Sequence, residues 1–226
     1  MGNPKLGGKI RPPFKKTETR FGVPKIKGRI HYDEKYVWVK DHWEFDLGAI
    51  DNKTKFVLSE DLVLKRTIVA CTAFLRIIKT WCYSQILECY VRERHKPKEK
   101  RLLITFVSDK FANYRNAFNK LFYRVATLKF GVPIACKRYG LAHNNNPIER
   151  HNKETGRCAA THETFQTHQG ASSTLILSRF VYNYVTPHNS LAGRTPAEVA
   201  GLDLPLGKNR LLGLIHLARK IEMTKY

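Results

Sequence analysis

The feature that most constrains the fold is a change of hydrophobic pattern along the first half of the chain. Beginning at residue 29, the chain contains three runs rich in aromatic and β-branched residues, HYDEKYVWV, WEFDLGAI and KFVLSEDLVL, separated by short polar turns. Apolar residues then recur at helical spacing from Ile68 to Ile86, and LLITFV at 102–107 has the length and β-branching of a buried strand. The pattern predicts three antiparallel strands, a helix packed on them and a fourth strand after a crossover.

The second half of the chain continues this alternation of strands and helices. The spacing predicts a helix through 114–121, an extended segment at 125–130, a polar loop at 139–146, and helices over 147–158 and 172–184. The order βββ-α-β-α-β-α-α mixes an antiparallel sheet with parallel crossover strands. We therefore expect an α/β domain with a mixed five-stranded sheet flanked by helices.

Three regions of different character divide the chain. Residues 1–28 carry Gly, Pro and Lys in irregular order without a hydrophobic period, which fits either a solvated tail or a basic arm that orders on binding nucleic acid. Residues 29–202 form the expected folded core. Residues 203–226 form a basic tail, which either extends a DNA-facing surface or packs as an amphipathic helix.

The charge of the chain implies a polyanionic partner. Lys and Arg number 40 against 19 Asp and Glu, which gives a formal charge of +21. Nucleic acid, anionic lipid and a ribosomal site all satisfy this charge. The most apolar stretch, 67–91, contains Arg76 and Lys79, so we expect a buried helix and no membrane span. Because no apolar run follows the basic N-terminus, we expect an intracellular, cytoplasmic protein without a secretory signal.

The cysteines do not indicate a disulfide framework or a metal ribbon. There are five, an odd number, and none forms a C-x-x-C pair. Cys158, His162 and His168 lie close in sequence, but a structural zinc site requires four ligands and a second Cys pair is missing.

Three acidic residues lie where the predicted topology brings them together. Asp33 is within the first strand, Asp109 follows the buried fourth strand, and Glu149 begins a helix. Phosphodiester transfer by two metal ions requires such a convergence, and carboxylate oxygens are the ligands that Mg²⁺ prefers. These residues are therefore candidates for a two-metal centre.

Four sequence blocks carry a resemblance to a known family. They are DEKYVWVKDHWEFDLGAID at 33–51, VSDKFANYRNAF at 107–118, NNPIERHNKETGR at 145–157 and FVYNYVTPHNSLAGRTPAEVAGL at 180–202. In this order they resemble the DDE transposases and retroviral-type integrase cores, particularly those of prokaryotic insertion sequences. The chain departs from the family at Lys110, where Gly is frequent, and no zinc ribbon or helix-turn-helix precedes the core. The second departure led us to expect a truncated chain, or end recognition by the basic arm or another subunit.

The resemblance implies a fold, an activity and partners. It implies a ribonuclease H-like fold and a DNA transposase that performs metal-dependent cleavage and strand transfer during transposition or DNA integration. Asp33, Asp109 and Glu149 would be catalytic and would hold Mg²⁺ or Mn²⁺, in two ions. DNA would be the partner, a homo-oligomer would join two element ends, and neither a small-molecule cofactor nor a membrane would be involved. The alternatives are a non-catalytic DNA-binding remnant of a transposase and a ribonuclease H-like nuclease without strand transfer.

Each candidate acid has a competing interpretation. Asp46 is the main rival of Asp33 for the role of first ligand, since acidic residues inside strands are depleted, whereas Asp41 and Asp51 fall at turns. Asp109 also fits the N-cap of the next helix, and Glu149 also fits an interaction with a helix dipole.

Basic and amide residues around Glu149 are candidates for binding DNA. Lys153 and Arg157 share a helix face with Glu149, and either grip phosphates or form surface ion pairs. Arg150, Asn145 and Asn146 are further candidates, although Asn pairs also make turns.

Structural roles are expected for residues of the last sequence block and for the aromatic residues of the first two strands. We expect His188 and Asn183 to be structural, and Thr195 to begin a capping box with Glu198. The aromatic residues of the first two strands are expected in the sheet core or in cross-strand pairs of the hairpin, namely Tyr36, Trp38, Trp43 and Phe45.

Overall fold

The computed structural model describes residues 21–131, 147–153 and 165–223. Its strands are β1 (Ile30–Val39), β2 (His42–Asp51), β3 (Val57–Val63), β4 (Thr105–Ser108) and β5 (Thr127–Phe130). Its helices are α2 (Ile68–Glu93), α3 (Ala112–Phe122), α5 (His168–Phe180), α6 (Pro196–Val199) and α7 (Arg210–Met223), and 147–153 is also helical. The predicted loop at 139–146 lies outside the described residues.

The five strands form one mixed sheet in the order β3-β2-β1-β4-β5. β1 pairs antiparallel with β2, and β2 with β3, whereas β4 lies parallel to β1 and β5 parallel to β4. The hairpins follow from the short turns between the first three strands, while a parallel partner requires the long α2 crossover. This strand order with these directions is the ribonuclease H-like fold, so the predicted fold class is confirmed.

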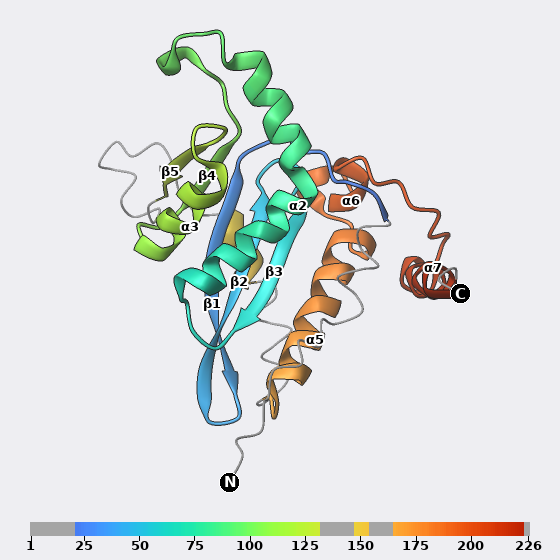
Figure 1. The fold of residues 1–226 in the computed structure, drawn as a ribbon. Helices are drawn as coiled ribbons and strands as arrows, with labels where there is room; N and C mark the ends of the chain where they lie inside the picture. Colours follow the sequence, from blue (N-terminus) through green and yellow to red (C-terminus); the bar gives the residue numbers. More distant parts are fainter. Residues whose placement is uncertain (1–20, 132–146, 154–164, 224–226) are drawn as a thin grey trace.

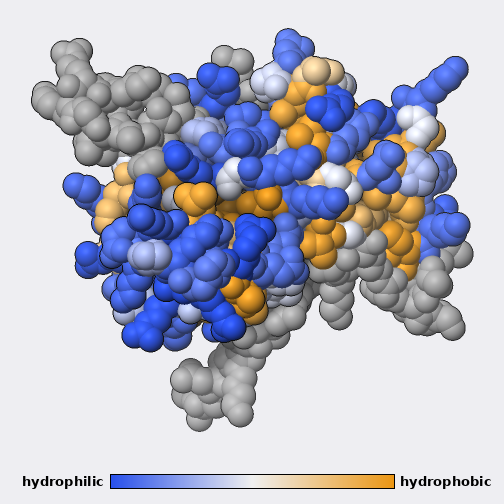
Figure 2. Space-filling model, turned by 90° about the horizontal axis from the view of Figure 1, so that it is seen from above, coloured by the Kyte–Doolittle hydropathy of each residue, from blue (hydrophilic) through white to orange (hydrophobic). Residues whose placement is uncertain are grey.

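Helices cover the sheet on two sides (Figure 1). α2 and α3 pack on one face, where Tyr32 and Phe106 belong to the main core. α5 covers the other face, where Ala171 and Leu175 pack against Val37 and other strand residues. Because successive side chains of a strand alternate between faces, Asp33 points to the α5 side and Glu34 to the α2 side. Seen from above, hydrophilic side chains cover most of the surface with apolar patches between them (Figure 2).

The long helix α2 begins where its sequence predicts. The Thr67 side chain accepts a hydrogen bond from the Ala70 N–H and so caps the first turn. Its buried positions Cys71, Phe74 and Ile78 follow the helical period. Within the described residues, no helix combines the length with the apolar character that crossing a bilayer requires.

Two elements differ from their predicted bounds by three residues or more at one end. The fourth strand begins at Thr105 instead of residue 102, because Leu102 is 77% exposed and parallel pairing with β5 starts at Thr105. The helix predicted over 172–184 runs over His168–Phe180 and continues as a π-helical turn, Val181–Val185. The Asn183 side chain holds this turn against β3, donating to the Val57 carbonyl at 3.0 Å and accepting from the Val57 N–H at 2.9 Å.

Residues 21–28 are packed, although their irregular composition predicted an arm that extends to residue 28. The Phe21 ring lies 5.4 Å from that of Tyr184 and is buried. The N–H groups of Lys27 and Gly28 donate to the Asp51 carboxylate at 2.8 and 2.9 Å. This segment is held by one aromatic side chain and a few backbone hydrogen bonds. Such contacts require no repeating apolar residues, so the hydrophobic pattern of the sequence did not predict them.

Several structural expectations are confirmed in the rest of the chain. Thr195 and Glu198 form the capping box at the start of α6. Within the segment expected to be a basic tail, Arg210–Met223 form α7, and Leu214 of this helix belongs to the core. The hairpin aromatic residues pair across β1 and β2, with 4.8 Å between the ring centroids of Trp38 and Trp43. The three described cysteines are free and buried, namely Cys71, Cys82 and Cys89.

Candidate metal centre

The parallel pairing of β1 and β4 brings Asp33 and Asp109 together. Ile30 pairs with Phe106 and His31 with Val107. Continuing this register by two residues places Asp33 beside Asp109, the first residue after β4. The site therefore forms where the end of β4 lies beside the middle of β1. The predicted proximity of these two acids is observed.

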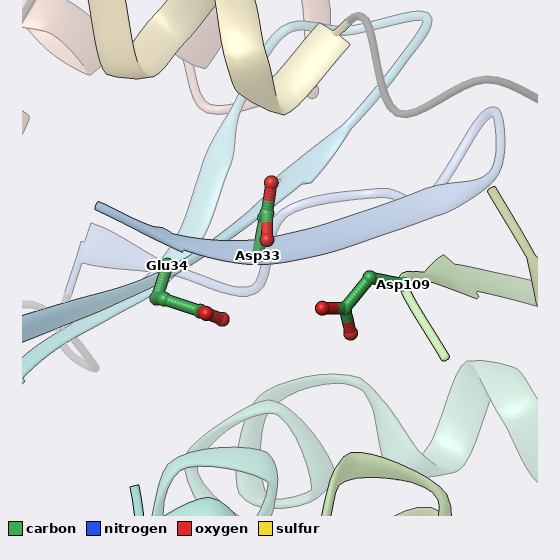
Figure 3. A group of neighbouring side chains, drawn as sticks. All are labelled: Asp33, Glu34 and Asp109. Carbon is green, nitrogen blue, oxygen red and sulfur yellow. The ribbon is translucent and has the colours of Figure 1, made fainter. Parts of the chain in front are cut away.

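Glu34 completes a group of three carboxylates. One oxygen from each of Asp33, Glu34 and Asp109 lies within 4.8 Å of the other two. Asp33 and Glu34 leave β1 on opposite sides, and Asp109 approaches from the end of β4 between them (Figure 3). Asp109 reaches both because it lies beyond the last residue of its strand.

The sequence did not single out Glu34, because strand alternation assigns it to the opposite face from Asp33. The Tyr114 hydroxyl donates to Glu34 at 2.8 Å, and Arg66 forms an ion pair with the same carboxylate. The signal that was available is the pair of adjacent acids inside a strand, where acidic residues are depleted.

The electrostatics of the centre are those of crowded carboxylates. Burial, followed by repulsion from Glu34, Asp109 and Glu149, raises the pKa of Asp33 to about 7. Glu149 is thus close enough for its charge to act on Asp33, although it is not one of the three residues whose oxygens converge. Burial also raises the pKa of Glu34, while its hydrogen bond from Tyr114 and the charge of Arg66 oppose that effect.

The helical segment 147–153 brings Glu149 to the Asp33 side of the sheet. It rests on β2 at Gly48, where a Cβ atom would lie only 3.2 Å from Ile148 Cδ1. Ile148 packs with Ile50 and Val57 of the sheet. A glycine at this position therefore permits the close approach of helix and strand.

The rival Asp46 has a different environment. It is 2% exposed, and its Oδ2 lies 2.9 Å from Lys35 Nζ. Lys35 also lies 3.5 Å from Glu60 Oε1. A lysine already balances this pair, so its environment favours a structural role for Asp46.

The candidates for DNA contact are only partly described. Arg150 and Lys153 are exposed on the segment 147–153. Asn145, Asn146 and Arg157 lie outside the described residues. The same is true of Cys158 and His162, whereas His168 lies 2.5 Å from Glu44 through its Nδ1 atom.

The centre has the chemistry of a site for hard divalent cations. Its donors are carboxylate oxygens from β1 and from the end of β4, and the repulsion of Asp33 by Glu34, Asp109 and Glu149 shows that negative charge is concentrated there. Such oxygen donors suit Mg²⁺ or Mn²⁺ rather than zinc, which favours Cys and His. The residues therefore fit a divalent metal.

Comparison with solved structures gives three relevant likenesses. A chain of the cryo-electron microscopy structure of the simian T-cell lymphotropic virus intasome, in complex with PP2A regulatory subunit B56 gamma, has a TM-score of 0.48 and 12% identity. The match covers 79% of this chain but only 55% of that one. The HTLV-2 integrase catalytic core domain in complex with magnesium has TM-scores of 0.41 in its dimeric form and 0.43 in its trimeric form, at 13% and 14% identity.

These two matches cover 79% of this chain, and 97% and 99% of the integrase chains. No family model and no curated protein matches the sequence. With TM-scores this low, the ribonuclease H-like fold of the chain rests on the order and directions of its own five strands.

Proposed function

We propose that the protein is a DNA transposase of the DDE type, which cleaves phosphodiester bonds and transfers the freed strand to target DNA with divalent metal ions. The observation that carries the proposal is that Asp33 of β1 and Asp109 after β4 lie close together. Glu149, on the helical segment 147–153, is near enough for its charge to raise the pKa of Asp33. This geometry suits the three acids of the sequence blocks. The insertion-sequence type rests on those blocks alone.

Asp33, Asp109 and Glu149 would bind the metal ions through their carboxylate oxygens. Bound there, Mg²⁺ or Mn²⁺ would activate the attacking oxygen and stabilise the leaving oxygen. Glu34 would act differently: held by Arg66 and Tyr114, its carboxylate would restrict through like-charge repulsion the positions that Asp109 adopts beyond the end of β4. We therefore assign Glu34 a positioning role.

The basic residues near Glu149 would hold the substrate. Lys153 and Arg150 are exposed and able to neutralise backbone phosphates, and Arg157, Asn145 and Asn146 are proposed for the same task from their sequence block. The formal charge of +21 supports a DNA partner. Joining two element ends requires a homo-oligomer with two active sites. An intracellular site of action and roles in DNA binding for 1–28 and 203–226 are part of the same proposal.

The test is an assay that scores cleavage and joining separately. Labelled DNA carrying the sequences that flank the gene is incubated with the protein and a plasmid target, in Mg²⁺, Mn²⁺ or EDTA. We expect cleaved and joined products with either metal and none in EDTA. Cleavage without joining would indicate a nuclease of the same fold, and binding without either product would indicate a non-catalytic remnant.

A further inference from the structure

A cleft of about 630 Å³ lies outside the group of converging carboxylates. Three segments form its walls: the turn between β2 and β3, the helical segment 147–153 and the chain that follows the π-helical turn. Its lining residues are Lys55, Pro147, Arg150, His151, Tyr182, Thr186, Pro187, His188, Asn189 and Ser190.

The walls of this cleft are joined through a small apolar cluster. Ile50 and Val57 of the sheet pack against Ile148 of the helical segment and against Tyr182. The two hydrogen bonds between Asn183 and Val57 fix the third wall to the sheet. The cleft is therefore formed by packed elements before any ligand binds.

The turn that carries Lys55 is held in an uncommon conformation. Lys55 has a φ of 61°, in the left-handed region that favours glycine or asparagine. Asp51 fixes this turn, because its carboxylate accepts the N–H groups of Lys53 and Thr54 at 2.8 and 2.9 Å. These hydrogen bonds hold the turn in place, and the Lys55 side chain lines the cleft from it.

The opposite wall is equally constrained. The His188 carbonyl accepts the N–H groups of Leu191 and Gly193 at 2.9 and 3.1 Å, which closes a tight loop. The Tyr182 ring lies 4.5 Å from His188 and 4.6 Å from His151. These ring contacts link the loop to the helical segment across the floor of the cleft.

The lining has the chemistry of a phosphate site. Lys55 and Arg150 supply two cations, and Thr186, Asn189 and Ser190 supply neutral hydrogen-bond donors. Among the described residues that line the cleft, none is acidic. A phosphodiester offers one negative charge and several acceptor oxygens, which this combination satisfies. The volume exceeds that of a single phosphate and leaves room for the attached sugars.

The cleft adjoins the proposed metal centre through one helix. The segment 147–153 carries Glu149, whose charge acts on Asp33, and the next residue, Arg150, lines the cleft. We propose that the cleft binds the sugar-phosphate backbone of DNA beside the phosphodiester that is cut. This inference deepens the proposed function and rests on it for the identity of the ligand.

The test compares two charge-matched double variants of the full chain. Lys55→Gln with Arg150→Gln removes the two cations of the cleft. Arg115→Gln with Lys120→Gln removes two exposed cations from α3, on the opposite face of the sheet. Binding of a labelled DNA duplex is measured in EDTA across a series of KCl concentrations, and thermal unfolding checks that each variant is folded.

We expect the cleft variant to bind DNA about tenfold more weakly at 0.1 M KCl, with a log–log salt slope lower by about two, since each lost phosphate contact removes close to one unit. The α3 variant should lose less than about threefold. Equal behaviour of the two variants would overturn the inference. If the two variants behaved equally while the wild type still cleaved DNA with Mg²⁺, the role of the cleft would be wrong and the proposed transposase function would remain.

A second measurement uses only the wild-type protein. Lysine acetylation is followed by mass spectrometry with and without DNA, and with deoxyadenosine monophosphate. We expect DNA to protect Lys55 more strongly than Lys120. Equal protection by the mononucleotide would indicate a small-molecule site and overturn the proposal. If DNA protected Lys55 but the protein never cleaved DNA, the cleft would still be a DNA-binding site and the catalytic function would be wrong.

Discussion

Two groups of carboxylates lie on the same sheet and differ in what balances their charge. Asp46 and Glu60 face Lys35, whose pKa stays raised because attraction from both acids outweighs the effect of its burial. Burial, followed by the nearby Asp46, raises the pKa of Glu60, while the charges of Lys35 and Arg179 oppose that effect. The acids of this group therefore have cations of the protein close to them.

The second group has the opposite character. Asp33 is surrounded by the carboxylates of Asp109, Glu34 and Glu149, and its pKa is raised to about 7. Within the part of the chain that the structure describes, Glu34 is the one acid of this group with a cation, Arg66, paired to it. The comparison shows why the choice between Asp33 and Asp46 depends on charge balance: one group is satisfied by the protein, while the other is suited to an external cation.

The largest expected effect separates the two groups by activity. Asp33→Asn, Asp109→Asn and Glu149→Gln should each lower metal-dependent cleavage and joining by at least about 10³-fold, because each would remove a metal-binding carboxylate. Asp46→Asn should retain most of the activity per folded molecule. Product formation is measured below the unfolding temperature of every variant.

Glu34→Gln refines the same experiment. Because Glu34 has a positioning role, Glu34→Gln should lower activity by only about tenfold. The order of activity among the variants should be the same with Mn²⁺ as with Mg²⁺. An inactive Glu34→Gln beside an active Glu149→Gln would mean that the third ligand is Glu34.

The next effect concerns the balanced group. Lys35→Met should destabilise the protein by about 3 kcal/mol, since it leaves the Asp46 carboxylate buried without its cation. Lys35→Met combined with Asp46→Leu should recover much of this loss, because no unpaired charge remains. Urea unfolding measures both values, and an unchanged midpoint for Lys35→Met would contradict the proposed balance.

Metal binding should stabilise the protein through the carboxylates around Asp33 and not through those around Asp46. At a Mg²⁺ concentration about ten times its dissociation constant, the wild type should gain about 1.4 kcal/mol, seen as a higher unfolding temperature. Asp46→Asn should respond in the same way, whereas Asp109→Asn should not. A full response of Asp109→Asn would place the ion elsewhere.

The last expected effect, comparable in size to that of metal binding, is a stabilisation without metal. The folded-state pKa of Asp33, about 7, lies above its ordinary value of 3.8, so the folded protein binds more protons and loses stability as pH rises between these values. Asp33→Asn should therefore stabilise the metal-free protein by about 1–2 kcal/mol above pH 7, and by little below pH 4. Unfolding in EDTA at several pH values measures this; a constant difference would show that the carboxylate group is not crowded.

The sequence by itself determined the main elements of this protein. The strands over 29–62, the α2 helix, the buried strand before Asp109 and the capping box at Thr195 all follow from local periodicity and capping chemistry. The position of Asp109 after a strand also predicted its meeting with Asp33, since parallel neighbours place such residues side by side.

Tertiary structure alone decided the rest. The convergence of Glu34 with Asp33 and Asp109 depends on how far Asp109 extends past β4. The structural role that we favour for Asp46 depends on Lys35 facing it across β1 and β2. The packing of Phe21 and the cleft at Lys55 and Arg150 join segments that are distant in sequence. Periodicity reports which face of its own element a residue occupies, whereas charge balance and cavities depend on what the other elements bring to that face.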